Sequence, residues 1–383
     1  MDISKALEEL KLKNYDEAAE LFRDAAESGN GDACDFMVQM YLLSLSDKVL
    51  KQDALRYAIK GYELRSKDSC FNMGTLYHNG LWGVPDLTKA YEFFLEGADD
   101  YHDPRCCHAL GEMLRQGETG GSPNVDEAVK RYGEAASRGY YPSQFMLAKI
   151  FENVVKDFAI TLDFYRNAAQ QGHVDAMLRL GVIYEKGIRV DKDIAQSLEW
   201  YEKAAEKGSD EASLKIAKIC LQPGIYQNVA EENRKRAYHL LSLLAEKGDH
   251  PHACYLLASM LESGQGIKKN ENKARLMYCS AAEQGVLPAL YKYACMMVWG
   301  TGGEKDPVQG FALLHVLYYL LTSHSIDIHS GDDLISPDEL LELTEKQLAD
   351  LEYDLSPEDK ATAFKMADER IGRIFGVSPE SAV

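Results

Sequence analysis

The chain has 383 residues, of which 46% are apolar and 27% are charged, a composition typical of a folded rather than a disordered protein. It carries 61 acidic and 42 basic residues, which gives a net charge of -19. That charge repels nucleic acid and anionic lipid, so both are poor default partners, whereas a basic protein or peptide would be attracted.

No run of about 18 apolar residues is present, and we therefore expect no membrane span. Residues 1–13 alternate charged side chains with Leu and Ile and lack the apolar core of a signal peptide. We expect a cytoplasmic chain whose eight cysteines are reduced thiols.

The first predicted element is a helix pair over residues 1–30 that caps the N-terminus. Its second half, from Asn14 to Phe22, resembles the second helix of a tetratricopeptide repeat. It also contains a landmark: Ala18 precedes the small pair Ala25-Ala26 by seven positions. Related landmarks recur along the chain and begin at Ala54, Ala90, Ala128, Thr161, Ser197, Ala237, Ala274 and Gly310.

The spacing of these landmarks indicates a repeated unit. Consecutive landmarks are 33 to 40 residues apart, and most spacings are close to 36. A second series, which lies in the preceding apolar segments, stretches and shrinks at the same places; it consists of Val38, Gly74, Gly111, Ala148, Gly181, Ala217, Ala258 and Ala294. Repeats of this length are typical of stacked helix pairs.

The clearest copy, residues 175–208, shows why each unit is predicted to be two helices. Ala176, Leu180 and Ile183 recur at helical spacing in the first half, and the second half repeats the pattern. Gly187 and Gly208 stand where a helix C-terminus favours a left-handed residue. Asp or Asn precedes the second helix in several copies, as expected of N-caps: Asp86, Asn124, Asp193, Asn270 and Asp306.

These patterns predict an all-α fold, a right-handed superhelical solenoid of about eight antiparallel helix pairs with a continuous core and a concave face. Small residues are expected where helices cross closely, namely at Gly74, Gly111, Gly181, Ala204, Ala205, Ala281 and Ala282. Two stretches depart from the pattern. Residues 39–66 lose the loop glycine, and residues 213–236 are expected to insert extra loop that includes Pro223-Gly224 and the charged stretch Glu231–Arg236.

The period stops after Leu321. A polar linker is expected over 323–335, followed by helices over about 337–352 and 357–375, each opened by a Ser-Pro pair (Ser336 and Ser356). Their apolar faces either cap the last repeat or form a partner-binding hairpin. The predicted organisation is therefore a cap over 1–30, a solenoid over 31–322, and a linker with a helical hairpin over 323–383.

The repeat resembles the Sel1-like repeat family, relatives of the tetratricopeptide repeats. Residues 176–208 match its pattern almost throughout, residues 70–90 form another good copy, and residues 253–285 match with Leu261 in place of Tyr. The resemblance covers about residues 12–320. It implies a protein-binding adaptor or regulatory subunit without a cofactor.

Exposed aromatic residues are the predicted partner contacts. Trp82 and Trp299 lie near loop glycines, and Tyr140 and Tyr141 are adjacent. Such side chains anchor peptides, although packing between repeats would also explain them.

The sequence gives less support for reactive or disulfide-bonded cysteines than for partner contacts. Cys34, Cys70, Cys107 and Cys254 share one place in their repeats. A cysteine-rich branch of the family clamps each repeat with a disulfide, and some of its members are described as β-lactam hydrolysing. The regular second cysteine is missing here, which favours buried thiols, with the vicinal pair Cys106-Cys107 as an outlier.

A metal site would have His324, Asp327 and His329 as candidate ligands, and a simple polar loop is the alternative. No nucleophile motif or phosphate-binding loop is present, so no catalytic residue is predicted.

We therefore predict a non-enzymatic scaffold that binds a protein or peptide on the concave face. The alternatives are an inhibitor or immunity protein against a basic toxin, and a β-lactam-hydrolysing enzyme.

Overall fold

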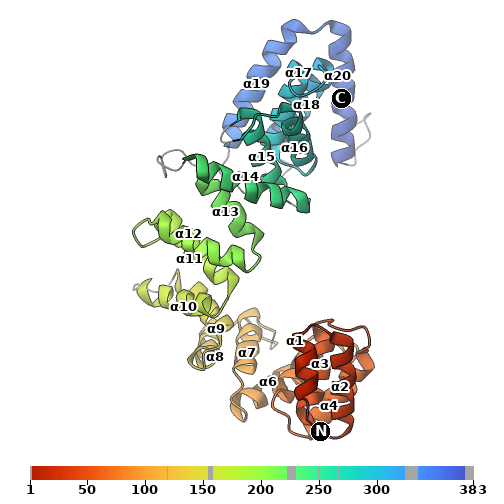
Figure 1. The fold of residues 1–383 in the computed structure, drawn as a ribbon, viewed down its shortest axis with the longest axis vertical. Coiled ribbons are helices and arrows are strands. Elements are labelled where there is room, and N and C mark those ends of the chain that lie inside the picture. The colour runs from red at the N-terminus through yellow and green to blue at the C-terminus, as the bar shows by residue number, and fades with distance from the viewer. Residues whose placement is uncertain are drawn as a thin grey trace. The chain divides into compact units, whose positions relative to one another are not determined.

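The computed structural model describes residues 2–118, 120–153, 158–221, 230–248, 250–264, 267–323 and 335–375. These residues form 20 α-helices and no strand (Figure 1). By packing, the chain divides into two compact units, Met1–Trp200 and Tyr201–Val383, which are described separately below. The all-α prediction is confirmed.

In the first unit, helices alternate between the first and second members of a pair. The first members are α1 (Ser4–Lys11), α3 (Gly31–Leu42), α5 (Ser69–His78), α7 (Pro104–Gln116), α9 (Tyr141–Phe151) and α11 (Val174–Lys186). The second members are α2 (Tyr15–Glu27), α4 (Lys51–Glu63), α6 (Leu87–Asp99), α8 (Val125–Ser137), α10 (Phe158–Gln170) and α12 (Ile194–Glu206), of which α12 crosses the boundary between the units.

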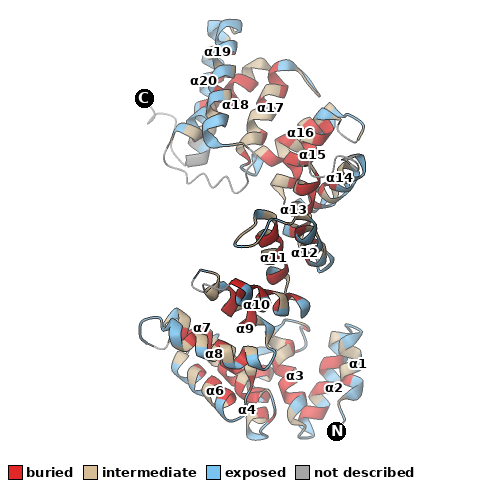
Figure 2. Cartoon of the chain, turned by 90° about the vertical axis from the view of Figure 1, so that its left-hand side faces the viewer, coloured by how far each residue is buried: buried red, intermediate tan, exposed pale blue. Residues whose placement is uncertain are grey.

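From α1 to α11, each helix packs against its neighbours in sequence, and two contacts reach further along the stack. Helix α3 contacts α5, and α5 contacts α7, whereas the second helices of these pairs make at most marginal contact with one another among the described residues. The first helices therefore form the inner layer here. Figure 2 shows the buried residues on the faces where helices meet.

The second unit continues the pairs and ends in a hairpin. Its pairs are α13 (Asp210–Leu221) with α14 (Ala230–Lys247), α15 (Pro251–Ser263) with α16 (Glu271–Glu283), and α17 (Leu287–Trp299) with α18 (Pro307–Thr322). Helices α19 (Pro337–Asp354) and α20 (Pro357–Phe375) both pack on α18. Leu351, Ala363 and Ala367 share one core cluster with Phe311 and Leu314, so the hairpin covers the end of the stack, as a C-terminal cap should.

Local sequence explains where the helices begin. All five predicted N-cap side chains accept a hydrogen bond from a backbone N–H of the first turn, at 2.9–3.1 Å. Ser336 and Ser356 cap α19 and α20 in the same way. Gly187 and Gly208 take left-handed φ angles of 68° and 90°, which terminate their helices as predicted.

The small landmark positions lie where a side chain would collide with the partner helix. A Cβ at Gly74 would lie 2.5 Å from the ring of Phe94, and one at Gly111 would lie 2.6 Å from the ring of Tyr132. At the equivalent Gly181, the carbonyl accepts a hydrogen bond from the Ser197 hydroxyl at 2.8 Å. Among the alanines, two are fully buried and two are half-buried: Ala204 and Ala281, then Ala205 and Ala282.

One prediction about the irregular stretches is wrong. The charged stretch Glu231–Arg236, expected as extra loop, forms the first turns of α14. Its residues are helix formers, and Glu231 pairs with Lys235 one turn later at 2.8 Å. A run of charged residues is therefore as compatible with a solvent-exposed helix as with a loop. Pro223-Gly224 lies outside the described residues.

Candidate partner-binding site

The four predicted aromatic contacts lie in different settings. Trp82 is half-buried, and its ring packs edge-on against Tyr77 with centroids 5.4 Å apart. Trp299, in the second unit, is 59% exposed. The rings of Tyr140 and Tyr141 stack at 6.2 Å, and Tyr141 remains 39% exposed.

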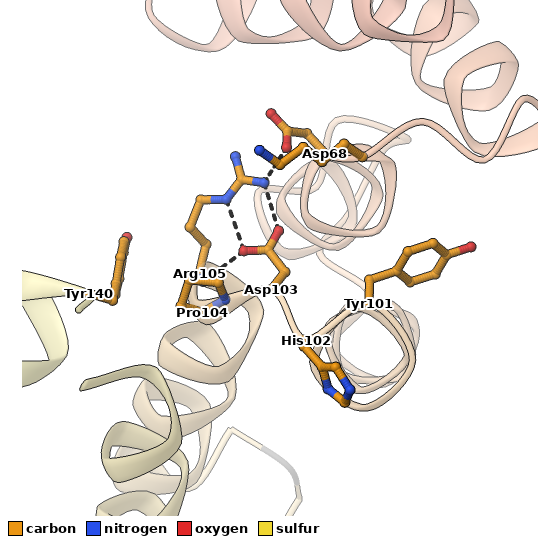
Figure 3. Close-up of a pocket in the computed structure, with 8 residues that line it drawn as sticks. Asp68, Tyr101, His102, Asp103, Pro104, Arg105 and Tyr140 are labelled. Carbon is orange, nitrogen blue, oxygen red and sulfur yellow. Dashed lines mark hydrogen bonds and ion pairs between the residues drawn. The ribbon is translucent and has the colours of Figure 1, made fainter. Parts of the chain in front are cut away.

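Tyr140 borders a cavity of ≈ 390 Å³ at the N-terminal ends of α5, α7 and α9. The cavity is lined by Lys67, Asp68, Tyr101, His102, Asp103, Pro104, Arg105 and Tyr140 (Figure 3). Sequence reasoning singled out Tyr140 alone among these residues. The others lie in the junctions that precede α5 and α7, or begin α7, and only the stacking of the pairs brings them together.

Arg105 organises this cavity through two carboxylates. Its guanidinium donates to Asp103 at 2.6 and 3.0 Å and to Asp68 at 2.5 Å, and it lies over the ring of Phe71 at 4.8 Å. Burial alone would lower the pKa of Arg105, but the hydrogen bonds to Asp103 and Asp68 outweigh it and raise the pKa. Asp103 also caps α7 by accepting the backbone N–H of Arg105 at 2.9 Å. The network holds the N-terminal ends of α5 and α7 at a defined separation.

A buried carboxylate on α3 binds the backbone of Asp68. Asp35 is 5% exposed and accepts hydrogen bonds from the backbone N–H of Asp68, the Ser66 hydroxyl and the Asn72 amide at 2.9–3.0 Å. Burial raises the pKa of Asp35 to about 6 despite these donors. Gln39, one turn further along α3, donates to Asp68 at 3.0 Å. Three consecutive first helices are therefore linked through polar side chains.

The backbone beside the cavity is strained. At six junctions between a second helix and the next first helix, glycine occupies the left-handed position: Gly29, Gly139, Gly172, Gly208, Gly248 and Gly285. At the other two, the position is held by Arg65, with φ 51°, and His102, with φ 53°. A residue with a Cβ costs about 1–2 kcal/mol in this conformation. Strain of this kind concentrates at functional sites.

Replacing His102 with glycine is therefore expected to raise the free energy of unfolding by about 1 kcal/mol, since the strain disappears while the unfolded chain gains some freedom. Gly139→Ala is the matched reverse change, because the position is left-handed and open, and it should lower the free energy by a similar amount. Urea unfolding monitored by circular dichroism measures both. If both substitutions changed the free energy of unfolding in the same direction, the strain argument would be contradicted.

Aromatic contacts continue from the cavity along the inner layer. His108 on α7 contacts Tyr140 at 5.4 Å, and His173, before α11, contacts Tyr141 at 5.6 Å and Phe145 at 4.4 Å. Burial lowers the pKa of both histidines, which favours neutral rings that stack. The cavity and this row offer rings, hydroxyl groups and charged groups, the mixture that binds peptides.

The chemistry of the cysteines and of possible metal ligands is limited. All eight cysteines are free thiols, and six of them are buried. Burial raises the pKa of Cys34 to about 11 and that of Cys70 to about 12, which suppresses the nucleophilic thiolate. Among the described residues, no three His, Cys, Asp or Glu side chains gather to hold a metal ion. His324, Asp327 and His329 lie outside the described residues, as does most of the predicted linker.

No helix in the described part of the chain is both long and apolar enough to cross a membrane.

Comparisons with known proteins agree with the architecture. Chitin synthase regulatory factor 3 of Schizosaccharomyces pombe is 37% identical over 70 residues, 18% of this chain and 7% of the relative. Cytochrome c oxidase assembly factor 7 of Mus musculus is 30% identical over 116 residues, 28% of this chain and 50% of the relative. The chain thus spans half or less of the length of these relatives.

Among solved structures, a protective antigen present in uropathogenic Escherichia coli strains superposes with a TM-score of 0.56. It is 23% identical, and the match covers 96% of this chain and 83% of that one, which shows a shared fold. The Sel1 repeat model matches residues 10–30, 67–102, 104–140, 142–173, 174–209, 210–249, 251–286 and 287–315. Residues 31–66, which diverge from the repeat pattern, still form the pair α3 and α4. With most of its length matched in register, the chain belongs to the Sel1 repeat family.

Proposed function

We propose that the chain is a non-enzymatic scaffold whose first unit binds a peptide segment of a partner protein at the cavity before α5, α7 and α9. The observation that carries this proposal is the combination of an organised polar centre with accessible aromatic rings. Arg105 is held by Asp68 and Asp103, while Tyr101, 41% exposed, and Tyr140 stand on opposite sides of it (Figure 3).

The charges around the cavity decide what the peptide must supply. Arg105 is already neutralised by two carboxylates, so it is a positioning group rather than a free anion-binding group. The tyrosine rings and hydroxyl groups then provide the anchoring contacts, and the bound segment would continue along the inner layer past His108 and Tyr141. The net charge of -19 favours a partner that is basic outside the bound segment.

The relatives support this kind of role without naming the partner. One is called an assembly factor and the other a regulatory factor, and both names describe action through other proteins. We accordingly assign the role of adaptor or regulatory subunit. The raised pKa values of the buried thiols favour it over a cysteine-dependent enzyme.

The test uses the full chain as bait in its native cells, followed by calorimetric titration of each purified partner. Tyr101→Ala combined with Tyr140→Ala should weaken binding at least about tenfold, because aromatic anchors dominate such interfaces. Tyr353→Ala is the control, since this tyrosine is 93% exposed in the second unit and should leave the affinity unchanged. Unfolding curves of each variant separate lost binding from lost folding.

Two outcomes would contradict the proposal. One is a partner whose affinity is the same for wild type and the Tyr101/Tyr140 variant. The other is hydrolysis of nitrocefin by the purified chain, which would favour the β-lactam-hydrolysing alternative.

A further inference from the structure

A second cavity lies wholly within the second unit, where the repeats end. It has a volume of ≈ 570 Å³ and lies between α16, α17, α18 and the last helix, α20. Its apolar floor includes Leu287, Leu290, Leu313 and Val316. Leu313 and Val316 of α18 are buried, while Leu287 and Leu290 of α17 are half-buried, so the part of the floor that stays uncovered lies on α17.

Two arginines of α20, Arg370 and Arg373, line the same cavity. In the part of the chain that the structure describes, neither Arg370 nor Arg373 makes an ion pair or a hydrogen bond. Other cations of this unit do: Arg236 pairs with Glu202 at 2.7 Å, and Lys292 pairs with Glu262 at 3.4 Å.

This arrangement is energetically unfavourable unless something else binds there. Arg370 is half-buried, so its guanidinium has lost part of its hydration without gaining a carboxylate. Acids outnumber bases by 61 to 42 in this chain, yet among the described residues the exposed Glu283 is the one acid that lines the cavity. The local charge is therefore opposite to the net charge of the chain.

We propose that this cavity binds an acidic, apolar peptide segment of a partner protein. Leucine-like side chains of the segment would cover the exposed part of the floor formed by Leu287 and Leu290. A carboxylate beside them would accept charge-assisted hydrogen bonds from Arg370 and Arg373. Glu283 disfavours a second acid at its own side of the cavity, which would set the direction of the peptide. This site is independent of the cavity proposed for the first unit.

The test measures fluorescence anisotropy of labelled peptides on the full chain. The probes are a panel in which a pair of leucine, phenylalanine or methionine residues is flanked by glutamates, and the same panel with lysine for each glutamate. At least one acidic peptide should bind saturably, and its lysine version should bind at least about tenfold more weakly. The binding should also weaken as salt is added.

Matched substitutions on α20 locate the binding. Arg370→Glu should lower the affinity for the acidic peptide at least about tenfold. Lys365→Glu makes the same change of charge at an exposed position of the same helix outside the cavity, and should leave the affinity nearly unchanged. Ala282→Phe fills the cavity from its half-buried rim without changing the charge, and should also abolish binding. Thermal melts show whether each variant folds.

Several results would overturn the proposal: failure of every acidic peptide, equal binding of the lysine panel, or equal effects of Arg370→Glu and Lys365→Glu. Sedimentation velocity tests whether a second copy of the chain occupies the cavity instead. A dimer of wild type that Arg370→Glu dissociates would show that a second copy of the chain, and not a peptide, fills the cavity.

Discussion

Replacing Gly111 with alanine is expected to destabilise the first unit by about 1–3 kcal/mol, although alanine is the better helix former. The added Cβ would lie 2.6 Å from the ring of Tyr132, closer than packed carbon atoms approach one another. That ring has no space to move, because it is fully buried and its hydroxyl donates to Glu112 at the next position of α7. Helices α7 and α8 must therefore separate, or the tyrosine must leave its rotamer.

Gly133, the residue after Tyr132 on α8, provides the control. A Cβ there meets nothing within 4 Å, so Gly133→Ala should stabilise the unit by about 0.5–1 kcal/mol through helix propensity alone. Urea unfolding of the two variants measures the contrast. A second variant, Tyr132→Leu in the Gly111→Ala background, should cost less than the sum of the single changes, because the smaller side chain makes room for the methyl group. Additive costs would show that the collision is not the cause.

The second large effect concerns pH and Asp35. Burial raises the pKa of Asp35 from 3.8 to about 6 in the folded chain. Between these values the folded carboxyl keeps its proton while the unfolded one releases it, so the folded state binds more protons. The contribution of this proton to the free energy of unfolding is therefore fully present below about pH 4, and it is lost as the pH rises through 6. The loss approaches about 3 kcal/mol, the equivalent of some two pKa units.

Asparagine has no proton to lose at this position. The stability of Asp35→Asn relative to wild type should therefore rise by about 2–3 kcal/mol between pH 4 and pH 7, measured by urea unfolding at both pH values. Asp32→Asn, measured at the same two pH values, serves as the control, because it makes the same substitution at an exposed position of the same helix. If Asp35→Asn behaves like the control, burial does not govern the protonation of Asp35.

The Tyr132–Glu112 contact belongs to a series that the sequence pattern did not reveal. In the pairs α7–α8, α9–α10 and α15–α16, a buried tyrosine of the second helix donates to a glutamate at the end of the first: Tyr132 to Glu112, Tyr165 to Glu152, and Tyr278 to Glu262. The last two glutamates also pair with the following repeat, through Arg179 and Lys292. The tyrosines could be recognised from their spacing as core residues. Their acceptors could not, because glutamates occur on most helices of this chain and no spacing distinguishes these three.

The architecture could be predicted from the amino-acid sequence: the helix-pair unit, its period, the caps at Asp86 and Asn270, the small positions such as Gly74, and the terminal hairpin. These features depend on residues close together in the chain, whose periodicity and capping chemistry act locally. The charged stretch Glu231–Arg236 shows where this reasoning stops, because exposed polar residues fit a loop and a solvated helix equally well.

Apart from Tyr140, the residues of the candidate sites could be identified only from the tertiary structure. Asp35, Asp68 and Arg105 are more than thirty residues apart in sequence and meet only because each stacked pair returns the chain to the same edge of the layer. The strain at His102 is likewise invisible without the six glycines that hold its position elsewhere, and the unpaired charge of Arg370 appears only when α20 is placed on α18. A solenoid repeats its core locally, but its surfaces combine residues from successive repeats, and one repeat alone does not encode them.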